Sequence, residues 1–330
     1  MASGNLTAQT EVTAPDGSNL LYVVTGGTTD GKIYLGGLNV QPDGTLVNGK
    51  ISVTVATNNI TVALKTKSGG NPSATDPVSI WINGTLRRCT APLSVTKNAG
   101  TNWFNAGAAE FATLEQDYFV YIIWNTTPAT DIVDIGFARI PYGRIYSDFS
   151  GTTTSEKYLA SSTTPTSTDD LCVVGRFAAT LSATAAFNWS VPTYTSINKI
   201  DVPIYETRLL TYAPTLTGYS VAPTATVYRY QIKNNTMKVH MTQGTNGTSN
   251  ATTISATAPM AAVTITNAFW AVTGYAAVDN ATVQTAPPVA VIASASSTIN
   301  IFKNSDGGTT AWTNVLGKRV GYIGLEYPLA

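Results

Sequence analysis

The residues that can carry acid–base or metal chemistry are few in this chain. His240 is the sole histidine, and it lies between Val239 and Met241 in a stretch whose alternation predicts a β-strand. Because neighbouring side chains on a strand point to opposite faces, His240 lacks a local partner. One histidine cannot supply the pair that most zinc sites with few cysteines need, and no G-x-S-x-G motif accompanies it. We therefore expect His240 to be structural or surface-exposed, and we assign no catalytic, cofactor-binding or metal-binding residue.

Three pairs of carboxylates lie close together in the sequence: Glu115 with Asp117, Asp131 with Asp134, and Asp169 with Asp170. Glycosidases use two acids roughly 5 to 9 Å apart, and residues two apart on a strand share a face at about 6–7 Å. Glu115 and Asp117 therefore suit this geometry in principle. No stacked repeat typical of a β-helix accompanies them, so we interpret all three pairs as solvated loop charges and rank an enzyme last.

Aromatic side chains suit ligand binding better, because sugar recognition uses ring faces and uncharged hydrogen-bonding groups. The chain has 6 Trp and 16 Tyr amid many Asn and Thr. Trp103 in NAGTNWFNAG and Trp312 in GGTTAWTN lie in turn-rich surroundings, and we name them as candidate ligand-binding residues. The alternative, that each ring fills a sandwich core, is favoured because aromatic residues dominate burial.

Residues 26 to 32 spell GGTTDGK, which fits the first seven positions of the phosphate-binding loop pattern. The eighth position requires Ser or Thr for magnesium, and it must open a helix whose N-terminal amides face the anion. Ile33 stands there, and IYLGGL is typical of a strand. We therefore exclude nucleotide binding here.

Composition narrows the class of protein further. Charged residues make up 12% of the chain, about half the usual share, and hydrophobic residues make up 43%, which predicts a folded protein with an uncharged polar surface. Nineteen basic and nineteen acidic residues give zero formal charge, which removes the attraction that dominates nucleic-acid binding. The N-terminus resembles no signal peptide, and no apolar run reaches the ~20 residues of a membrane span. Without a signal peptide, Cys89 and Cys172 are expected to be reduced. We expect both to be buried and to pack like small apolar residues.

Alternation of period two is widespread, which favours an all-β protein. Ile51, Val53 and Val55, then Ile60, Val62 and Leu64 after Asn58-Asn59, predict a hairpin. Val78, Ile80 and Ile82 predict one face of a further strand that ends at Asn83-Gly84, and the run FVYIIW from Phe119 to Trp124 predicts a fully buried strand. One short helix is expected around Ala106 to Gln116, and the Ser/Thr-rich stretch from Ser147 to Asp170 is expected to contain a long exposed loop.

The sequence changes character around Tyr194 to Pro214, which suggests a domain boundary. We predict an all-β fold with a short N-terminal β module over residues 1–40, followed by two antiparallel β-sandwich (jelly-roll-like) domains over residues 41–205 and 206–330.

The stretch from Leu6 to Leu38 carries a resemblance to a known family. It combines an extended lead-in, a turn with Asp16, the apolar run LLYVV, a Gly-Gly-Thr turn, Lys32-Ile33 and a closing Leu38. This arrangement resembles a short module near the N-termini of tailed-bacteriophage fibre and other virion appendage proteins. From Tyr212 onward, Tyr228-Arg229-Tyr230, Asn234-Asn235, Met237 to Met241 and Gly247-Thr248-Ser249 look like a β-sandwich module common at the C-terminal ends of such appendages. The middle of the chain is similar to uncharacterised phage structural genes.

The resemblance implies a non-enzymatic bacteriophage virion protein, a tail fibre or other appendage synthesised in the host cytoplasm. It implies a homotrimer whose residues 1–40 dock on other virion proteins and assist trimerisation, while the distal part contacts a host-surface glycan. Uncharged strand edges, which associate unless covered, agree with oligomerisation. Two alternatives stay open: a capsid head fibre or decoration protein that stabilises the particle, and a free carbohydrate-binding module or adhesin.

Overall fold

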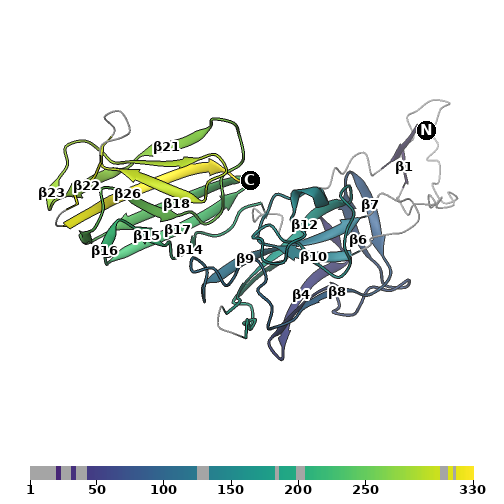
Figure 1. The fold of residues 1–330 in the computed structure, drawn as a ribbon. Coiled ribbons are helices and arrows are strands. Elements are labelled where there is room, and N and C mark those ends of the chain that lie inside the picture. The colour runs from purple at the N-terminus through teal and green to yellow at the C-terminus, as the bar shows by residue number, and fades with distance from the viewer. Residues whose placement is uncertain are drawn as a thin grey trace, which may run out of the picture.

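The computed structural model describes residues 20–23, 31–34, 43–124, 134–182, 186–197, 205–304, 311–314 and 317–330. The fold is all-β, as predicted, and its sheets are antiparallel throughout. Among these residues the one helical element is a single 3₁₀ turn, η1 (Tyr146–Asp148). Figure 1 shows the strands gathered into two bodies that lie end to end.

A separate two-stranded sheet precedes the two bodies. It pairs β1 (Leu20–Val23) with β2 (Gly31–Tyr34) in antiparallel register, and Tyr22 lies opposite Lys32. Lys32 and Ile33 lie within strand β2, as expected from IYLGGL. A phosphate-binding loop would instead require a helix to begin at this point. The rest of the predicted 1–40 module lies outside the described residues.

The first body is a β-sandwich. Its large sheet has five strands in the order β11 (Ala160–Ser161), β10 (Asp134–Ala138), β9 (Glu115–Trp124), β12 (Asp170–Thr180) and β13 (Tyr194–Ile197). Two three-stranded sheets face it, one formed by β3 (Leu46–Val47), β6 (Val78–Ile82) and β7 (Thr85–Cys89), the other by β4 (Gly49–Ala56), β5 (Asn59–Thr66) and β8 (Leu93–Lys97). One apolar cluster joins Val62 and Ile80 of the short sheets to Val120 and Phe177 of the large sheet.

The hairpin and the alternating strand predicted for this sandwich are confirmed. Strands β4 and β5 form the expected hairpin, with Val53 opposite Val62. Its turn is one residue earlier than expected, at Thr57 and Asn58, whose φ angles of 48° and 65° match the right-handed twist of the strands. Strand β6 alternates between buried and half-buried side chains and ends at Ile82, directly before the turn at Asn83 and Gly84, as predicted.

Strand β9 is buried on both faces, which explains its unbroken apolar sequence. Tyr118 and Val120 belong to the core inside the first sandwich, whereas Phe119 and Tyr121 point the other way, into a cluster that continues through the second body. The predicted long loop between Ser147 and Asp170 crosses this outer side, and Phe149 packs edge-on against Tyr121 at 5.2 Å. Many of its Ser and Thr side chains are exposed, as expected.

The helix predicted around Ala106 to Gln116 is wrong. The segment forms successive turns, and Asn105 and Thr113 have φ angles of 56° and 61°, which a right-handed helix excludes. Phe111 is buried, and Glu115 and Gln116 belong to β9 instead. Pairing with β12 therefore recruits the end of the segment that local propensity assigned to a helix.

The second body is also a β-sandwich. One sheet has the order β14 (Leu210–Thr211), β17 (Thr226–Lys233), β18 (Thr236–Gln243), β26 (Gly317–Pro328), β19 (Gly247–Ser249) and β16 (Tyr219–Val221), and β22 (Tyr275–Asp279) joins it through β26 and carries β23 (Thr282–Val283). The facing sheet has the order β15 (Leu216–Thr217), β20 (Ile254–Thr257), β25 (Thr298–Phe302), β24 (Val289–Ala293) and β21 (Phe269–Thr273). The two sandwiches share no strand, and the predicted boundary at residue 205 falls between β13 and β14.

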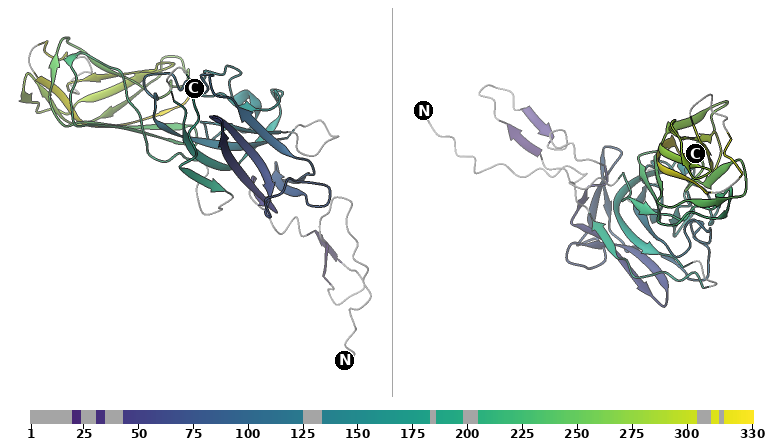
Figure 2. Two further views of the ribbon diagram at one scale, coloured as in Figure 1. Left: turned by 90° about the horizontal axis from the view of Figure 1, so that it is seen from below. Right: turned by 90° about the vertical axis from the view of Figure 1, so that its left-hand side faces the viewer.

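A buried polar network joins the two sandwiches at a contact that we call the joint. Arg139 at the end of β10 is 2% exposed, and its guanidinium donates to Gln116 Oε1 at 3.0 Å and to Tyr230 Oη at 3.2 Å. The Tyr230 hydroxyl, on β17 of the second sandwich, donates in turn to Gln116 Oε1. Because these groups are buried and hydrogen-bonded across the joint, the sandwiches are held in one relative orientation. The left-hand view of Figure 2 shows the resulting elongated molecule.

Candidate functional site

The carboxylates considered as a catalytic pair hold the joint together. Asp117 is 1% exposed, and the Arg208 side chain donates to its Oδ1 from Nε at 2.9 Å and from Nη2 at 2.7 Å. The same Nη2 atom donates to Glu115 Oε1 at 2.6 Å. The interpretation as solvated loop charges is therefore wrong for this pair, because both residues lie in β9 and neutralise an arginine from the start of the second sandwich.

The other carboxylates also have structural partners. Asp134 is fully buried and accepts hydrogen bonds from the Thr163 backbone N–H at 2.8 Å and its hydroxyl at 2.7 Å. Asp169 is 3% exposed and caps a turn through Thr166. Both side chains are buried, so the prediction of solvated charges fails here too, while Asp131 lies outside the described residues. Within the described ranges no group of three or more His, Cys, Asp and Glu side chains gathers as a metal site would require.

The two candidate tryptophans are in different places. Trp312 is 2% exposed, and its indole N–H donates to Ile301 O at 2.8 Å inside the second sandwich. It therefore fills a core, and its ring is not presented to ligands. Trp103 is half-buried on the first sandwich, stacked on Tyr158 with centroids 5.6 Å apart, and Lys97 Nζ lies 5.1 Å from its ring centre. The structure does not bring Trp103 and Trp312 together.

His240 and the cysteines occupy structural positions. His240 Nδ1 lies 2.9 Å from the Tyr322 hydroxyl, so its partner comes from β26 rather than from its own strand. Both cysteines are buried thiols, as expected, and burial raises the pKa of the Cys172 thiol.

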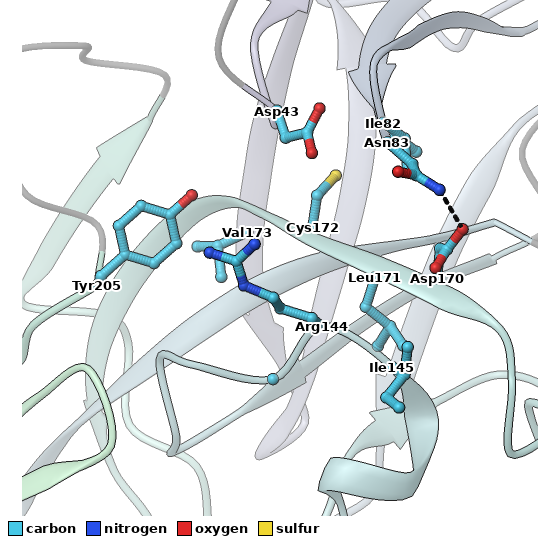
Figure 3. Close-up of a pocket in the computed structure, with 11 residues that line it drawn as sticks. Asp43, Ile82, Asn83, Arg144, Ile145, Asp170, Leu171, Cys172, Val173 and Tyr205 are labelled. Carbon is cyan, nitrogen blue, oxygen red and sulfur yellow. Dashed lines mark hydrogen bonds between the residues drawn. The ribbon is translucent and has the colours of Figure 1, made fainter.

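Two hollows lie beside the joint and share Arg144 and Tyr205; we call them together the junction groove. The smaller hollow is about 150 Å³ and the larger about 500 Å³. Figure 3 shows the smaller hollow, in which Arg144 and Tyr205 extend toward each other and Asp43 faces Cys172. Asn83 donates to Asp170 at 3.2 Å along its far side. The larger hollow is lined by Tyr142, Arg144, Asp148, Lys157, Tyr205, Asn234, Asn235, Val263, Leu329 and Ala330.

Backbone hydrogen bonds fix the walls of the larger hollow. The Arg144 N–H donates to Asp148 Oδ2 at 2.8 Å, and its carbonyl accepts from the Leu171 N–H at 2.7 Å. On the opposite wall, Asn234 forms the turn between β17 and β18 with a φ of 51°, and its N–H donates to Tyr205 O at 2.8 Å. Lys157 Nζ reaches the Ala330 backbone oxygen at 2.5 Å. Both sandwiches therefore build the groove, and the joint sets its width.

Cationic side chains outnumber carboxylates in the lining of the larger hollow. Arg144 and Lys157 contribute two cations, and Asp148 is the one carboxylate among the lining side chains. Burial lowers the pKa of Lys157, and attraction to Asp148 opposes that shift. Burial raises the pKa of Tyr142, whose hydroxyl has no hydrogen-bond partner within the described part of the chain. The groove therefore offers cationic and phenolic donors to a ligand.

Sequence reasoning did not find this site. Arg144 and Lys157 come from irregular segments of the first sandwich, and Asn234 and Asn235 were identified only as a turn. Their proximity depends on how two domains pack, which no local pattern in the chain encodes.

No protein-family model, curated protein sequence or solved structure matches this chain. Among the described elements, no helix is long and apolar enough to cross a membrane.

Proposed function

We propose that the chain is a non-enzymatic structural component of a bacteriophage virion, a fibre or other appendage that takes part in attachment to the host surface. The observation that carries the proposal is the tandem of two β-sandwiches behind a separate N-terminal two-stranded sheet, in a chain of which only 12% of the residues are charged. Together with the resemblance of residues 6–38 and of the segment from Tyr212, this architecture suits a projecting spacer. Residues 1–40 dock on other virion proteins in this proposal.

The joint supports a mechanical role. An appendage that presents a distal surface needs its domains held in line, and buried networks with every member paired rigidify a structure. Arg139, Gln116 and Tyr230 form such a network, and Arg208 adds a second link to Asp117.

Exposed apolar side chains on the second sandwich support assembly as a homotrimer. Val227, Tyr322 and Tyr275 are 46%, 42% and 76% exposed. Strand register places them in one row across β17, β18, β26 and β22, with Thr242 between the first two. Exposed apolar side chains that gather on one face often mark interaction surfaces on soluble proteins.

Light scattering of the purified protein tests the assembly. A mass about three times the 34.7 kDa of one chain supports the fibre proposal. A stable monomer contradicts it and favours the free carbohydrate-binding module, which the junction groove also supports.

Deletion of residues 1–40 tests the docking role. We expect the truncated protein to fold, because the described residues of this segment pair only with each other, and to be missing from purified particles. Normal incorporation of the truncated protein contradicts the docking assignment. Antibody labelling of intact particles in the electron microscope then separates a tail appendage from a head fibre or decoration protein.

A further inference from the structure

We infer that the larger hollow of the junction groove binds an anionic saccharide, with the carboxylate or phosphate of the sugar held by Arg144 and Lys157. The inference rests on the proposed role in host attachment, because that role supplies the kind of ligand. It adds the ligand's chemical class and the residues that recognise it.

Arg144 carries the first part of the argument. Its backbone is fixed on both sides by Asp148 and Leu171, while its side chain is exposed and joins none of the ion pairs of the described chain. Arg139 and Arg208, in contrast, direct their donors to groups of the protein itself. A planar guanidinium with unused donors matches the two oxygens of a carboxylate or phosphate. The backbone of Arg144 is thus held in place, while its guanidinium forms no ion pair within the described residues.

Among the side chains that line the larger hollow, the two cations Arg144 and Lys157 outnumber the one carboxylate, Asp148. Asp148 Oδ2 accepts backbone N–H groups from Arg144 at 2.8 Å and from Ile145 at 3.2 Å, so part of its charge is already compensated. Lys157 donates to the Ala330 backbone oxygen, which leaves two of its three ammonium hydrogens for a ligand. Partial burial disfavours the charged form of Lys157, and an anion in the hollow would offset that cost.

The remaining lining suits a sugar rather than a bare ion. The volume of about 500 Å³ lies within the range of small-molecule pockets. Asn234 and Asn235 offer amide donors and acceptors from the second sandwich, and Tyr142 and Tyr205 offer phenol groups and apolar ring surface from the other side. A saccharide presents hydroxyls to such amides and C–H faces to such rings.

Calorimetric titration of the full chain tests the inference with three probes. A hyaluronan tetrasaccharide supplies carboxylates, N-acetylglucosamine 6-phosphate supplies a phosphate, and chitotetraose is a neutral control of similar size. We expect at least one anionic probe to bind at least about tenfold more tightly than chitotetraose, since charge-assisted bidentate hydrogen bonds are the strong ones. Raising the ionic strength from about 0.05 to about 0.5 M should weaken that binding.

Variants assign the binding to the groove. Arg144→Gln should weaken anionic binding about tenfold or more, and Lys157→Gln by a smaller factor. Arg88→Gln is the matched control, because Arg88 is an exposed arginine on β7 that does not line the groove. Circular dichroism of each variant confirms folding.

Each outcome decides the inference. Binding of the phosphate probe alone, lost in Arg144→Gln, supports the anionic site and assigns the anion as phosphate. Equal affinity for chitotetraose, or no anionic binding that depends on Arg144, overturns the inference. Neither of those results alters the mass in solution or the incorporation of the protein into particles, so a failure here is distinguishable from a failure of the appendage proposal.

Discussion

At the scale of single residues, burial decides what each charged or aromatic side chain does. Asp117 has the residue type of a catalytic acid, yet its side chain is inaccessible to solvent and bound to Arg208 by three hydrogen bonds, one of them from the backbone N–H. Glu115, two residues earlier, is about one-third exposed and shares the same arginine. We therefore expect Asp117 to contribute more to the stability of the fold than Glu115.

Asp117→Asn should lower the free energy of unfolding by about 2 kcal/mol, because hydrogen bonds to a charged group contribute about 1.5–3 kcal/mol. Glu115→Gln is the matched control and should cost less than about 1 kcal/mol, as exposed ion pairs do. Urea unfolding at neutral pH measures both. Equal losses in the two variants contradict this ranking.

Trp312→Ala should destabilise the second sandwich by about 3–5 kcal/mol, because it removes a large buried ring and leaves a cavity. Trp103→Ala should cost less, since that ring is half-buried at the surface. Thermal unfolding followed by circular dichroism compares them. A larger effect at Trp103 would show that its contact with Tyr158 and Lys97 supports more of the fold than its exposure indicates.

At the scale of elements, tight turns set the register of the strands. Asn83 and Gly84 connect β6 to β7 with φ angles of 48° and 69°, and nothing lies within 4 Å of the position where a Gly84 side chain would begin. Gly218, between β15 and β16, has a φ of 90°, and a Cβ there would lie 2.0 Å from Thr253 O. Both turns require a positive φ, but only at Gly218 is there also no room for a Cβ atom.

Gly84→Ala should cost about 1–2 kcal/mol, the strain of a left-handed conformation for a residue with a Cβ. Gly218→Ala should cost about 3 kcal/mol or more, because about 1–3 kcal/mol of overpacking against backbone adds to the same strain. Urea midpoints of the two variants give the comparison. Similar midpoints would mean that the backbone around Thr253 shifts freely.

At the scale of the whole molecule, buried tyrosines lie in both core clusters and at the joint. Burial raises the pKa of Tyr118, Tyr121, Tyr212, Tyr230 and Tyr327. Their hydroxyls therefore hold their protons more tightly in the folded protein than in the unfolded chain, where the pKa is about 10.

The protein should therefore lose stability as the pH rises above about 10, because the unfolded chain releases protons that the folded protein retains. The contribution of these tyrosines is fully present below that pH. Absorbance of tyrosinate and circular dichroism should change together in one alkaline transition. Smooth titration of all the tyrosines without loss of structure contradicts this expectation, and the urea-unfolded protein provides the reference titration.

The sequence alone determined the all-β class, the hairpin around Asn58, the alternating strand from Val78 to Ile82 and the burial of Phe119 to Ile123, although Trp124, expected to be buried with them, is half-buried. Period-two alternation and turn residues are local properties, so they can be read along the chain. Residue type predicted the buried cysteines, because free cysteine is among the residues most often found in the interior.

Only the tertiary structure decided the rest. Glu115 and Gln116 form part of a strand and not of the expected helix, because they pair with β12. Trp312 is buried inside the second sandwich and is therefore not available to a ligand. The junction groove has no local pattern at all: Arg144 and Asn234 are 90 positions apart in the numbering and meet only because the Arg139–Gln116–Tyr230 network docks one sandwich on the other. Sites of this kind depend on contacts between segments that are distant in the sequence. The free energy of those contacts comes from the packing of the two domains and not from the local conformational propensity of each residue.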